Sequence, residues 1–339
     1  MASRSFVFWW GWGVVGALCA LEGPAGAQGP PDYDIQWRTV GTPGNRTTLP
    51  GDVPFQPDLR IGSVSSSYRI AQTELTRSQW LEFVLAYAPF HPGSPNDVLF
   101  TGLGITNHGG GPTDYHVDPG TGNLPADAGW RYAARYANWL CHGKDGAPAA
   151  FESGAYDTTT FTADGSGSVN DQVHHTPGAQ FWIPTRDEWT KAVYYDPDRY
   201  GPGQDGYWRY PNGTDNVLIS GLPGEGGQTN AGAGVPFGTQ LPVGSYPGVQ
   251  SPWGLLDASG GLSEWIEDPW TTTGRNIRLT MGSGARDFDY PSVDLLGRTG
   301  PGGSVDGVVT HGIRIASAVP SPSSLVAVLL VPLFNRRQR

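Results

Sequence analysis

Cysteine is nearly absent from this chain of 339 residues, which contains only Cys19 and Cys141. Cys19 lies in an N-terminal segment that we expect to be removed, so the mature protein would keep one thiol and no internal disulfide. CxxC and HExxH patterns do not occur, and the seven histidines are scattered apart from the adjacent pair His174-His175. The spacing therefore predicts no transition-metal site of the common kinds.

Charged residues are also scarce, at 15% of the chain, and the formal net charge is -10. Binding to a phosphate backbone requires clustered Lys and Arg side chains. The sequence has no such cluster, and we expect no nucleic acid among its partners.

Glycine and proline are abundant instead, with 50 and 30 residues, and this argues against long regular elements. The 13 tryptophans and 14 tyrosines nevertheless supply a large apolar area for a core. The composition indicates a loop-rich globular protein of one large domain or two ordinary ones.

Three helices are predicted from capping signals and from apolar residues at three- and four-residue steps. Thr185 and Glu188 form a capping box at the start of one helix, and Thr76 and Gln79 form a capping box at the start of another. The third helix is predicted from about Asp127 to Leu140. Residues 88–125, 143–180 and 197–240 are predicted to be mostly irregular.

Short strands make up the rest of the predicted framework, because short β-branched or aromatic runs are bounded by turn formers. They are expected at Ile35–Val40, Ser67–Ala71, Phe181–Ile183, Leu241–Tyr246, Leu262–Ile266, Ile277–Met281 and Gly312–Ala316.

The N-terminus has the pattern of a secretory signal peptide over residues 1–27. Arg4 precedes the apolar run Phe6–Ala20, and small residues at Ala25–Ala27 form a cleavage site before Gln28. A retained membrane anchor is the alternative interpretation. We expect cleavage, because the apolar run is short, and therefore export from the cell.

The C-terminus, residues 319–339, resembles the PEP-CTERM sorting tail of bacterial exported proteins. A Pro-Ser-Pro sequence at 320–322 precedes the apolar run Leu325–Phe334 and a basic end. Ser321 stands where that family has Glu, and the apolar run is about half a membrane span. The resemblance implies a transient membrane association and a final place outside the cell or in the cell envelope.

Six sequence blocks follow one another as in formylglycine-generating, sulfatase-modifying-factor domains. They are YRIAQTELTRSQWLEF (68–83), GWRYAARYANWL (129–140), FWIPTRDEWTKAVYYDP (181–197), PVGSYP (242–247), SPWGLLDASGGLSEWIED (251–268) and GIRIA (312–316). We place this domain at residues 32–318. The resemblance implies an α+β fold with few short helices, short strands and much irregular loop, related to C-type lectins.

The enzymes of that family use molecular oxygen and copper to oxidise a cysteine of a client sulfatase to formylglycine. Two cysteines that follow an Arg-Gly-Gly-Ser-type strand bind the copper. The corresponding strand here is Arg278–Ala285, and the segment Arg286–Arg298 after it has no cysteine. Because Asp287 and Asp289 cannot replace soft thiolate ligands, copper is not expected. The histidine-rich domain of the ergothioneine-type relatives is absent as well.

Calcium is the second metal that the resemblance implies. The family motif Gly-Asn-Val-Trp-Glu-Trp appears here as Gly260-Gly261-Leu262-Ser263-Glu264-Trp265. The Glu264 carboxylate and the carbonyls of Gly260 and Leu262 are candidate ligands, and a second family site would begin at Asn230. The alternative role for Glu264 is to accept hydrogen bonds from neighbouring N–H groups without a metal.

Aromatic residues of the loops are the candidates for ligand contact, and they are Trp208, Tyr210, Trp253 and Trp270. Trp139, Trp189 and Trp265 lie in periodic blocks and are expected in the core. Arg314 is expected to hold a buried carboxylate. No catalytic residue is predicted.

The leading hypothesis is an exported, non-catalytic binding or surface module, a pseudoenzyme whose ligand is a protein or glycan at the cell envelope. The alternative is an enzyme of the same family with altered, cysteine-independent chemistry that involves Asp287 and Asp289. A purely structural envelope component is a third class.

Overall fold

The structure is a computed structural model of the chain, and it describes residues 29–162, 171–233, 240–270, 277–304 and 310–320. These residues belong to one compact unit, Gly29–Pro320. The predicted signal peptide, and the sorting tail from residue 321 onward, lie outside the described residues. Within the described ranges, every helix is too short or too polar to span a lipid bilayer.

The three predicted helices are present as α1 (Arg77–Tyr87), α3 (Trp130–Cys141) and α5 (Arg186–Tyr194). Both predicted capping boxes are confirmed, in which Thr76 caps α1 and Thr185 caps α5. Helix α3 begins later than predicted because the residues before its N-cap form a strand. The shorter helices are α2 (Val98–Thr101), α4 (Ala149–Glu152), α6 (Tyr290–Val293), η1 (Ala88–Phe90), η2 (Thr158–Thr160) and η3 (Pro223–Glu225).

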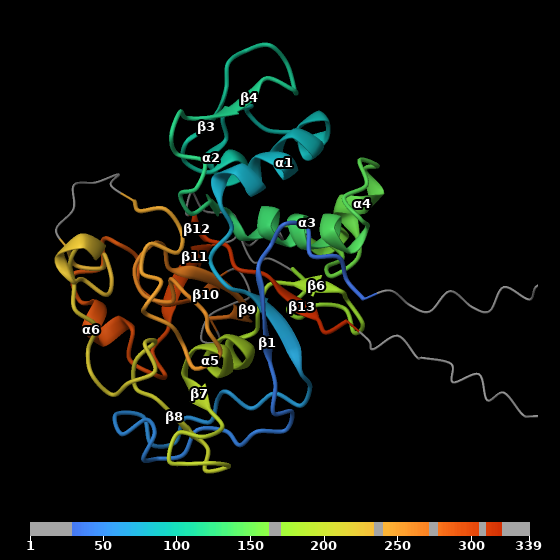
Figure 1. Ribbon diagram of the computed structural model, residues 1–339. Coiled ribbons are helices and arrows are strands. Elements are labelled where there is room, and N and C mark those ends of the chain that lie inside the picture. The colour runs from blue at the N-terminus through green and yellow to red at the C-terminus, as the bar shows by residue number, and fades with distance from the viewer. Residues whose placement is uncertain (1–28, 163–170, 234–239, 271–276, 305–309, 321–339) are drawn as a thin grey trace, which may run out of the picture. The chain divides into compact units, whose positions relative to one another are not determined.

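The described strands form two larger sheets and two ribbons, so the predicted α+β class is confirmed (Figure 1). The five-stranded sheet has the order β11-β10-β9-β12-β5, formed by Gly300–Ser304, Ile277–Met281, Glu264–Pro269, His311–Gly312 and Asp127–Ala128. The four-stranded sheet has the order β1-β2-β13-β6, formed by Trp37–Val40, Tyr68–Ala71, Ala316–Ala318 and Phe181–Trp182. The ribbons pair β3 (Ile105–Asn107) with β4 (Tyr115–Val117) and β7 (Tyr195–Asp196) with β8 (Gly206–Tyr207).

Two strand predictions were wrong in part. The segment Leu241–Tyr246 is a turn, because Pro242 has no N–H and Gly244 adopts a left-handed φ of 74°. The predicted strand Gly312–Ala316 is divided between the two sheets: β12 ends at Gly312 and β13 begins at Ala316. Arg314 lies in the crossover between them, and this position brings its side chain into the core.

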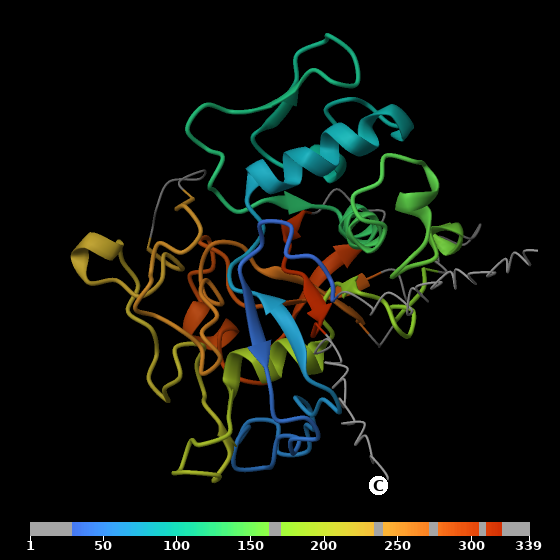
Figure 2. The ribbon, with the colours of Figure 1, turned by 45° about the vertical axis from the view of Figure 1, so that its right-hand side comes forward.

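Buried tryptophans join the elements through their indole N–H groups. Trp130 donates to the carbonyl of Ile266 at 3.1 Å, and Trp265 donates to that of Ala128 at 2.7 Å. Trp139 and Trp189 are also buried, so the predicted core role of these aromatics is confirmed. Helix α5 packs against β9 and β10, while α3 packs against β6 (Figures 1 and 2). Helix α5 thus supports the five-stranded sheet, and α3 supports the four-stranded one. The site described next lies where β9 begins and β10 ends.

Candidate functional site

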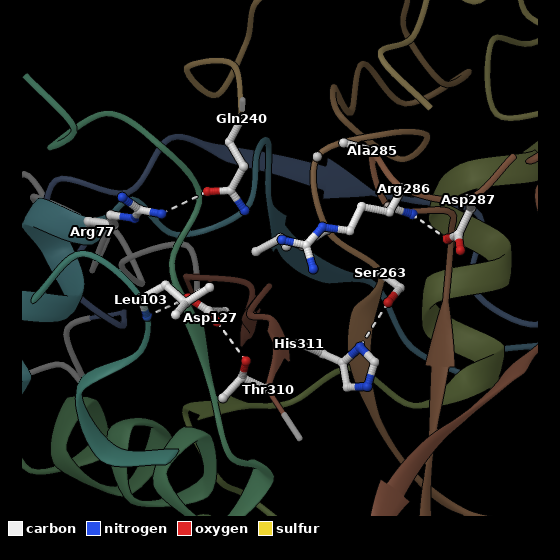
Figure 3. Close-up of a pocket in the computed structure, with 13 residues that line it drawn as sticks. Arg77, Leu103, Asp127, Gln240, Ser263, Ala285, Arg286, Asp287, Thr310 and His311 are labelled. Carbon is white, nitrogen blue, oxygen red and sulfur yellow. Dashed lines mark hydrogen bonds between the residues drawn. The ribbon is translucent and has the colours of Figure 1, made fainter. Parts of the chain in front are cut away.

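A cavity of about 230 Å³ lies where the residues before β9, the strands β12 and β5, and the turn after β10 meet. We call it the β9 pocket (Figure 3). Its lining residues are Arg77, Leu103, Asp127, Gln240, Gly261, Leu262, Ser263, Gly284, Ala285, Arg286, Asp287, Thr310 and His311. The parallel pairing of Gly312 with Glu264 sets the preceding residues, His311 and Ser263, side by side.

Ser263 and His311 are in direct contact in this pocket. The Ser263 Oγ lies 2.8 Å from His311 Nδ1, and His311 Nε2 lies 2.7 Å from the carbonyl oxygen of Gly302. A carbonyl can only accept, so Nε2 carries the imidazole proton and Nδ1 accepts from the serine hydroxyl. Burial lowers the pKa of His311, which keeps the ring neutral near pH 7.

Arg77 lines the opposite side of the pocket (Figure 3). Its Nη2 donates to Gln240 Oε1 at 2.8 Å, and its Nε has no hydrogen-bond partner among the described residues. The residue is only 7% exposed, and burial lowers the pKa of its guanidinium although Asp127 and Asp118 oppose this. The Arg77 guanidinium therefore lines the pocket as a largely buried cation, and one of its nitrogens is bonded to Gln240.

Asp127 is already occupied by the protein. Its Oδ1 accepts from the Leu103 N–H at 2.9 Å and its Oδ2 accepts from the Thr310 hydroxyl at 2.6 Å. These contacts tie strand β5 to the loops around the pocket, and each oxygen of the carboxylate accepts one hydrogen bond from the protein.

The turn after β10 supplies Arg286 and Asp287. Asp287 Oδ2 accepts from the Gly284 N–H at 2.7 Å and so fixes the turn. Arg286 is exposed, and its side chain extends toward the middle of the pocket (Figure 3). The pocket thus holds two guanidinium groups next to a serine–histidine contact.

Copper does not fit this site. The segment Arg286–Arg298 offers no thiolate, and Cys141 at the end of α3 is not among the residues that line the pocket. The Cys141 thiol donates to the Phe181 carbonyl at 3.4 Å, and burial raises its pKa. Asp289 does not line the pocket either, so the two aspartates proposed for altered chemistry do not act together there.

The contacts of Glu264 do not fit calcium. Its Oε1 accepts from Arg314 Nη2 at 2.6 Å, and its Oε2 accepts from Arg314 Nε at 2.8 Å and from Trp189 Nε1 at 2.7 Å. Calcium at Glu264 would have to displace a guanidinium that is itself fully buried. The expected role of Arg314 as the partner of a buried carboxylate is confirmed.

The other predicted calcium ligands lie beside Glu264. The Asn230 Oδ1 accepts from the Gly261 N–H at 2.8 Å, the Leu262 N–H donates to Glu74 Oε1 at 2.8 Å, and the Gly260 N–H donates to a serine hydroxyl at 3.1 Å. The described residues contain no group of three or more His, Cys, Asp or Glu side chains arranged to hold a metal ion. Calcium therefore stays a prediction, which the contacts of the Glu264 carboxylate and of the Asn230 amide oxygen do not favour.

None of the four predicted ligand aromatics lines the β9 pocket. Trp208 donates to Asp196 at 3.0 Å, Tyr210 donates to the Pro291 carbonyl at 3.1 Å, and Trp253 packs against the core. Trp270 lines a separate cavity of about 380 Å³ together with His174, Arg186 and Asp268. A ligand role for these aromatics stays a prediction.

The adjacent histidines His174 and His175 both lie close to a buried carboxylate. His175 Nδ1 lies 3.0 Å from an oxygen of the buried Glu267, while His174, with a side chain 66% exposed, lies 3.7 Å from the other oxygen. Burial opposes ionisation of Glu267, but hydrogen bonds from both histidines hold its pKa below the usual value. The pair is an anchor for a buried carboxylate.

The sequence did not identify Ser263 and His311 as site residues, although both lie in or next to family blocks. Ser263 stands where the motif Gly-Asn-Val-Trp-Glu-Trp has its first tryptophan, and His311 directly precedes GIRIA. Exchange of an indole for a hydroxymethyl group opens space at this point. Serine in place of this tryptophan was therefore the signal by which the sequence could have indicated the pocket.

A family model for the sulfatase-modifying factor enzyme 1-like domain matches residues 56–317. Among solved structures, CarF is similar with 17% identity and a TM-score of 0.49, over 85% of this chain and 99% of that chain. Treponema denticola variable protein 1 has 17% identity and a TM-score of 0.47, over 84% of this chain and 95% of that one. PvdO from Pseudomonas aeruginosa has 16% identity and a TM-score of 0.43, over 84% and 92%. No curated protein matches the chain.

Proposed function

The chain belongs to the sulfatase-modifying factor enzyme 1-like family, and we propose that it is an exported binding module that holds an anionic ligand in the β9 pocket. The family that the six sequence blocks predicted is thereby confirmed. In this proposal the chain has the fold of the copper-dependent oxidases but binds a ligand instead of oxidising a cysteine.

One observation carries the proposal: the pocket has two guanidinium groups where the family resemblance implies a copper centre. Arg77 is nearly buried and its Nε has no partner among the described residues, while Arg286 extends into the pocket from the turn after β10. Guanidinium groups bind carboxylate and sulfate oxygens through paired N–H donors. An acidic group is therefore the ligand chemistry that the pocket favours.

The carboxylates of the pocket do not cancel this preference. Asp127 accepts two hydrogen bonds and Asp287 accepts one from the backbone of its own turn. Their oxygens accept hydrogen bonds from protein donors, whereas the Arg77 guanidinium lines the pocket as a largely buried cation. The sequence supports a ligand outside the cell, because the predicted signal peptide and sorting tail direct the protein to the envelope. Acidic glycans and acidic protein segments at the envelope both carry the required group.

An array of acidic and neutral glycans and peptides, probed with the purified full-length chain, tests the proposal. We expect acidic compounds to bind, and Arg286→Gln to weaken binding about 10-fold or more, because a charge-assisted hydrogen bond contributes about 1.5–3 kcal/mol. Arg60→Gln is the matched control, since Arg60 is also exposed but contacts only the carbonyls of Pro57 and Leu59. Binding that is confined to neutral compounds, or that is equal in both variants, would contradict the proposal.

The absence of copper chemistry is tested separately. The full-length chain is incubated with a cysteine-containing sulfatase peptide, with and without copper, and formylglycine is measured by mass spectrometry. We expect no turnover above the control without protein. Turnover that requires copper would show that the chain is an oxidase.

A further inference from the structure

The contact between Ser263 and His311 has the arrangement of a nucleophile and its general base. Because Nε2 donates to the Gly302 carbonyl at 2.7 Å, the lone pair of Nδ1 is directed at the Ser263 hydroxyl, 2.8 Å away. A serine hydroxyl becomes nucleophilic when a neutral imidazole within hydrogen-bond distance can take its proton. The group that orients the histidine base is the backbone carbonyl of Gly302.

The histidine ring is held from a second side as well. The Trp265 ring meets it edge to face, with 4.6 Å between centroids and an interplanar angle of 79°. The charged groups that act on His311 are Asp127 and Asp287, and both favour its protonated form. An imidazolium formed during a reaction is therefore stabilised, while burial keeps the resting ring neutral.

The hydroxyl of Ser263 is open to a ligand, because the residue is half-buried and lines the β9 pocket. Arg286 extends into the middle of that pocket, between Ser263 and Arg77 (Figure 3). A ligand whose acidic group is bound at Arg77 would thus place its other end toward Ser263, with a guanidinium beside the reacting carbonyl. A volume of about 230 Å³ restricts such a ligand to a small molecule or the end of a chain.

We propose that Ser263 is a nucleophile that cleaves small carboxylic esters bearing a second, anionic group, with His311 as its general base. The Ser263 oxygen attacks the ester carbonyl, and its proton passes to His311 Nδ1. The tetrahedral intermediate expels the alcohol, which takes that proton, and an acyl-serine remains. Water then attacks the acyl group, gives a proton to Nδ1, and restores Ser263, so ester and water become acid and alcohol. The Arg286 guanidinium stabilises the oxyanion in both steps.

This inference rests on the proposed function, because the same pocket must first bind the acidic group. The full-length chain is treated with a fluorophosphonate, and the adduct is located by tandem mass spectrometry. Hydrolysis of p-nitrophenyl hydrogen succinate is measured in parallel. We expect one adduct, on Ser263, and hydrolysis that Ser263→Ala abolishes. His311→Gln should lower kcat/KM about 100-fold or more, since a general base contributes about 10²–10⁴-fold.

Ser245→Ala is the matched control, because the Ser245 hydroxyl is half-buried but bonds to the Pro242 carbonyl outside the pocket. It should keep both labelling and hydrolysis. The adduct is located on the wild-type chain, so this measurement tests the inference even if Ser263→Ala does not fold. An adduct elsewhere, or hydrolysis equal in wild type and Ser263→Ala, overturns the inference. If acidic compounds still bind in an Arg286-dependent way, that result leaves the proposed function intact, whereas loss of binding as well removes both.

Discussion

Ser263 and Glu264 are neighbours in the chain, but the structure places their side chains in opposite surroundings. Glu264 is 1% exposed and all of its contacts are made within the protein, by Arg314 and Trp189. Ser263 lines a pocket with Arg77 and Arg286 and contacts one neutral histidine. Glu264 and Arg314 form a buried ion pair that stabilises the fold, whereas Arg77 and Arg286 line the pocket in which we propose that a ligand binds. Two neighbouring residues of the motif therefore differ in their surroundings: Glu264 belongs to the core and Ser263 lines the pocket.

The largest expected effect is loss of the buried ion pair. Arg314→Met leaves the Glu264 carboxylate buried without a cation, and removal of one partner of such a pair costs about 3–5 kcal/mol. The midpoint of denaturant unfolding, read at an unchanged slope, measures this loss. Arg60→Met, at an exposed position, should cost about 0.5 kcal/mol or less. A loss below about 1 kcal/mol for Arg314→Met would show that the ion pair of Arg314 and Glu264 does not stabilise the fold as described.

A second buried carboxylate sharpens the comparison, because the described residues that bond to it include no cation. Asp294 accepts from the Ser283 N–H at 2.9 Å, from the Ser283 hydroxyl at 3.0 Å and from the Ser259 hydroxyl at 2.6 Å. Burial raises its pKa to about 7 against these hydrogen bonds, and Asp287 adds to the rise. Compared with Glu264, Asp294 shows what burial does when only hydroxyl and amide donors are present.

The free energy of unfolding should therefore fall as pH rises through the window set by Asp294. Between an unfolded pKa of about 4 and the folded pKa of about 7, the folded state holds a proton that the unfolded state has released. The loss should reach roughly 3–4 kcal/mol and be complete above the folded pKa. Asp294→Asn should remove this dependence, since the serine hydroxyls can rotate to meet an amide.

Unfolding in denaturant at several pH values measures the pH range over which the free energy of unfolding falls. Asp58→Asn, at an exposed position, is the control and should leave the pH profile unchanged. If wild type and Asp294→Asn lose stability in parallel as pH rises, Asp294 is ionised in the folded state and the comparison with Glu264 fails.

Local signals predicted the framework well. The capping boxes at Thr76 and Thr185 act within one helical turn, so the sequence alone specified where α1 and α5 begin. The strand error at Leu241–Tyr246 has a local cause too, since Pro242 and Gly244 favour a turn over extended pairing.

The site depended on contacts that no local pattern contains. Ser263 and His311 are 48 positions apart, and Glu264 and Arg314 are 50 apart. The buried role of Arg314 could be predicted because an arginine within an apolar block requires a carboxylate. The pairing of β12 with β9 was needed to show which carboxylate Arg314 meets. The same pairing was needed to show that His311 contacts Ser263. The calcium hypothesis for Glu264 had the same cause: the sequence shows the carboxylate but does not show that Arg314 is its partner.

The smallest expected effect is that of calcium through Glu264. Binding of calcium only to the folded state would stabilise it by about 2.7 kcal/mol at a concentration 100 times the Kd. We expect the difference in Tm between excess calcium and chelator to be the same in wild type and in Glu264→Gln, because the Arg314 guanidinium already occupies both oxygens of the carboxylate. Thermal unfolding of both variants in both buffers measures this difference. A stabilisation by calcium that wild type shows and Glu264→Gln lacks would mean that the ion displaces Arg314 from the Glu264 carboxylate and that this buried ion pair is open to a ligand.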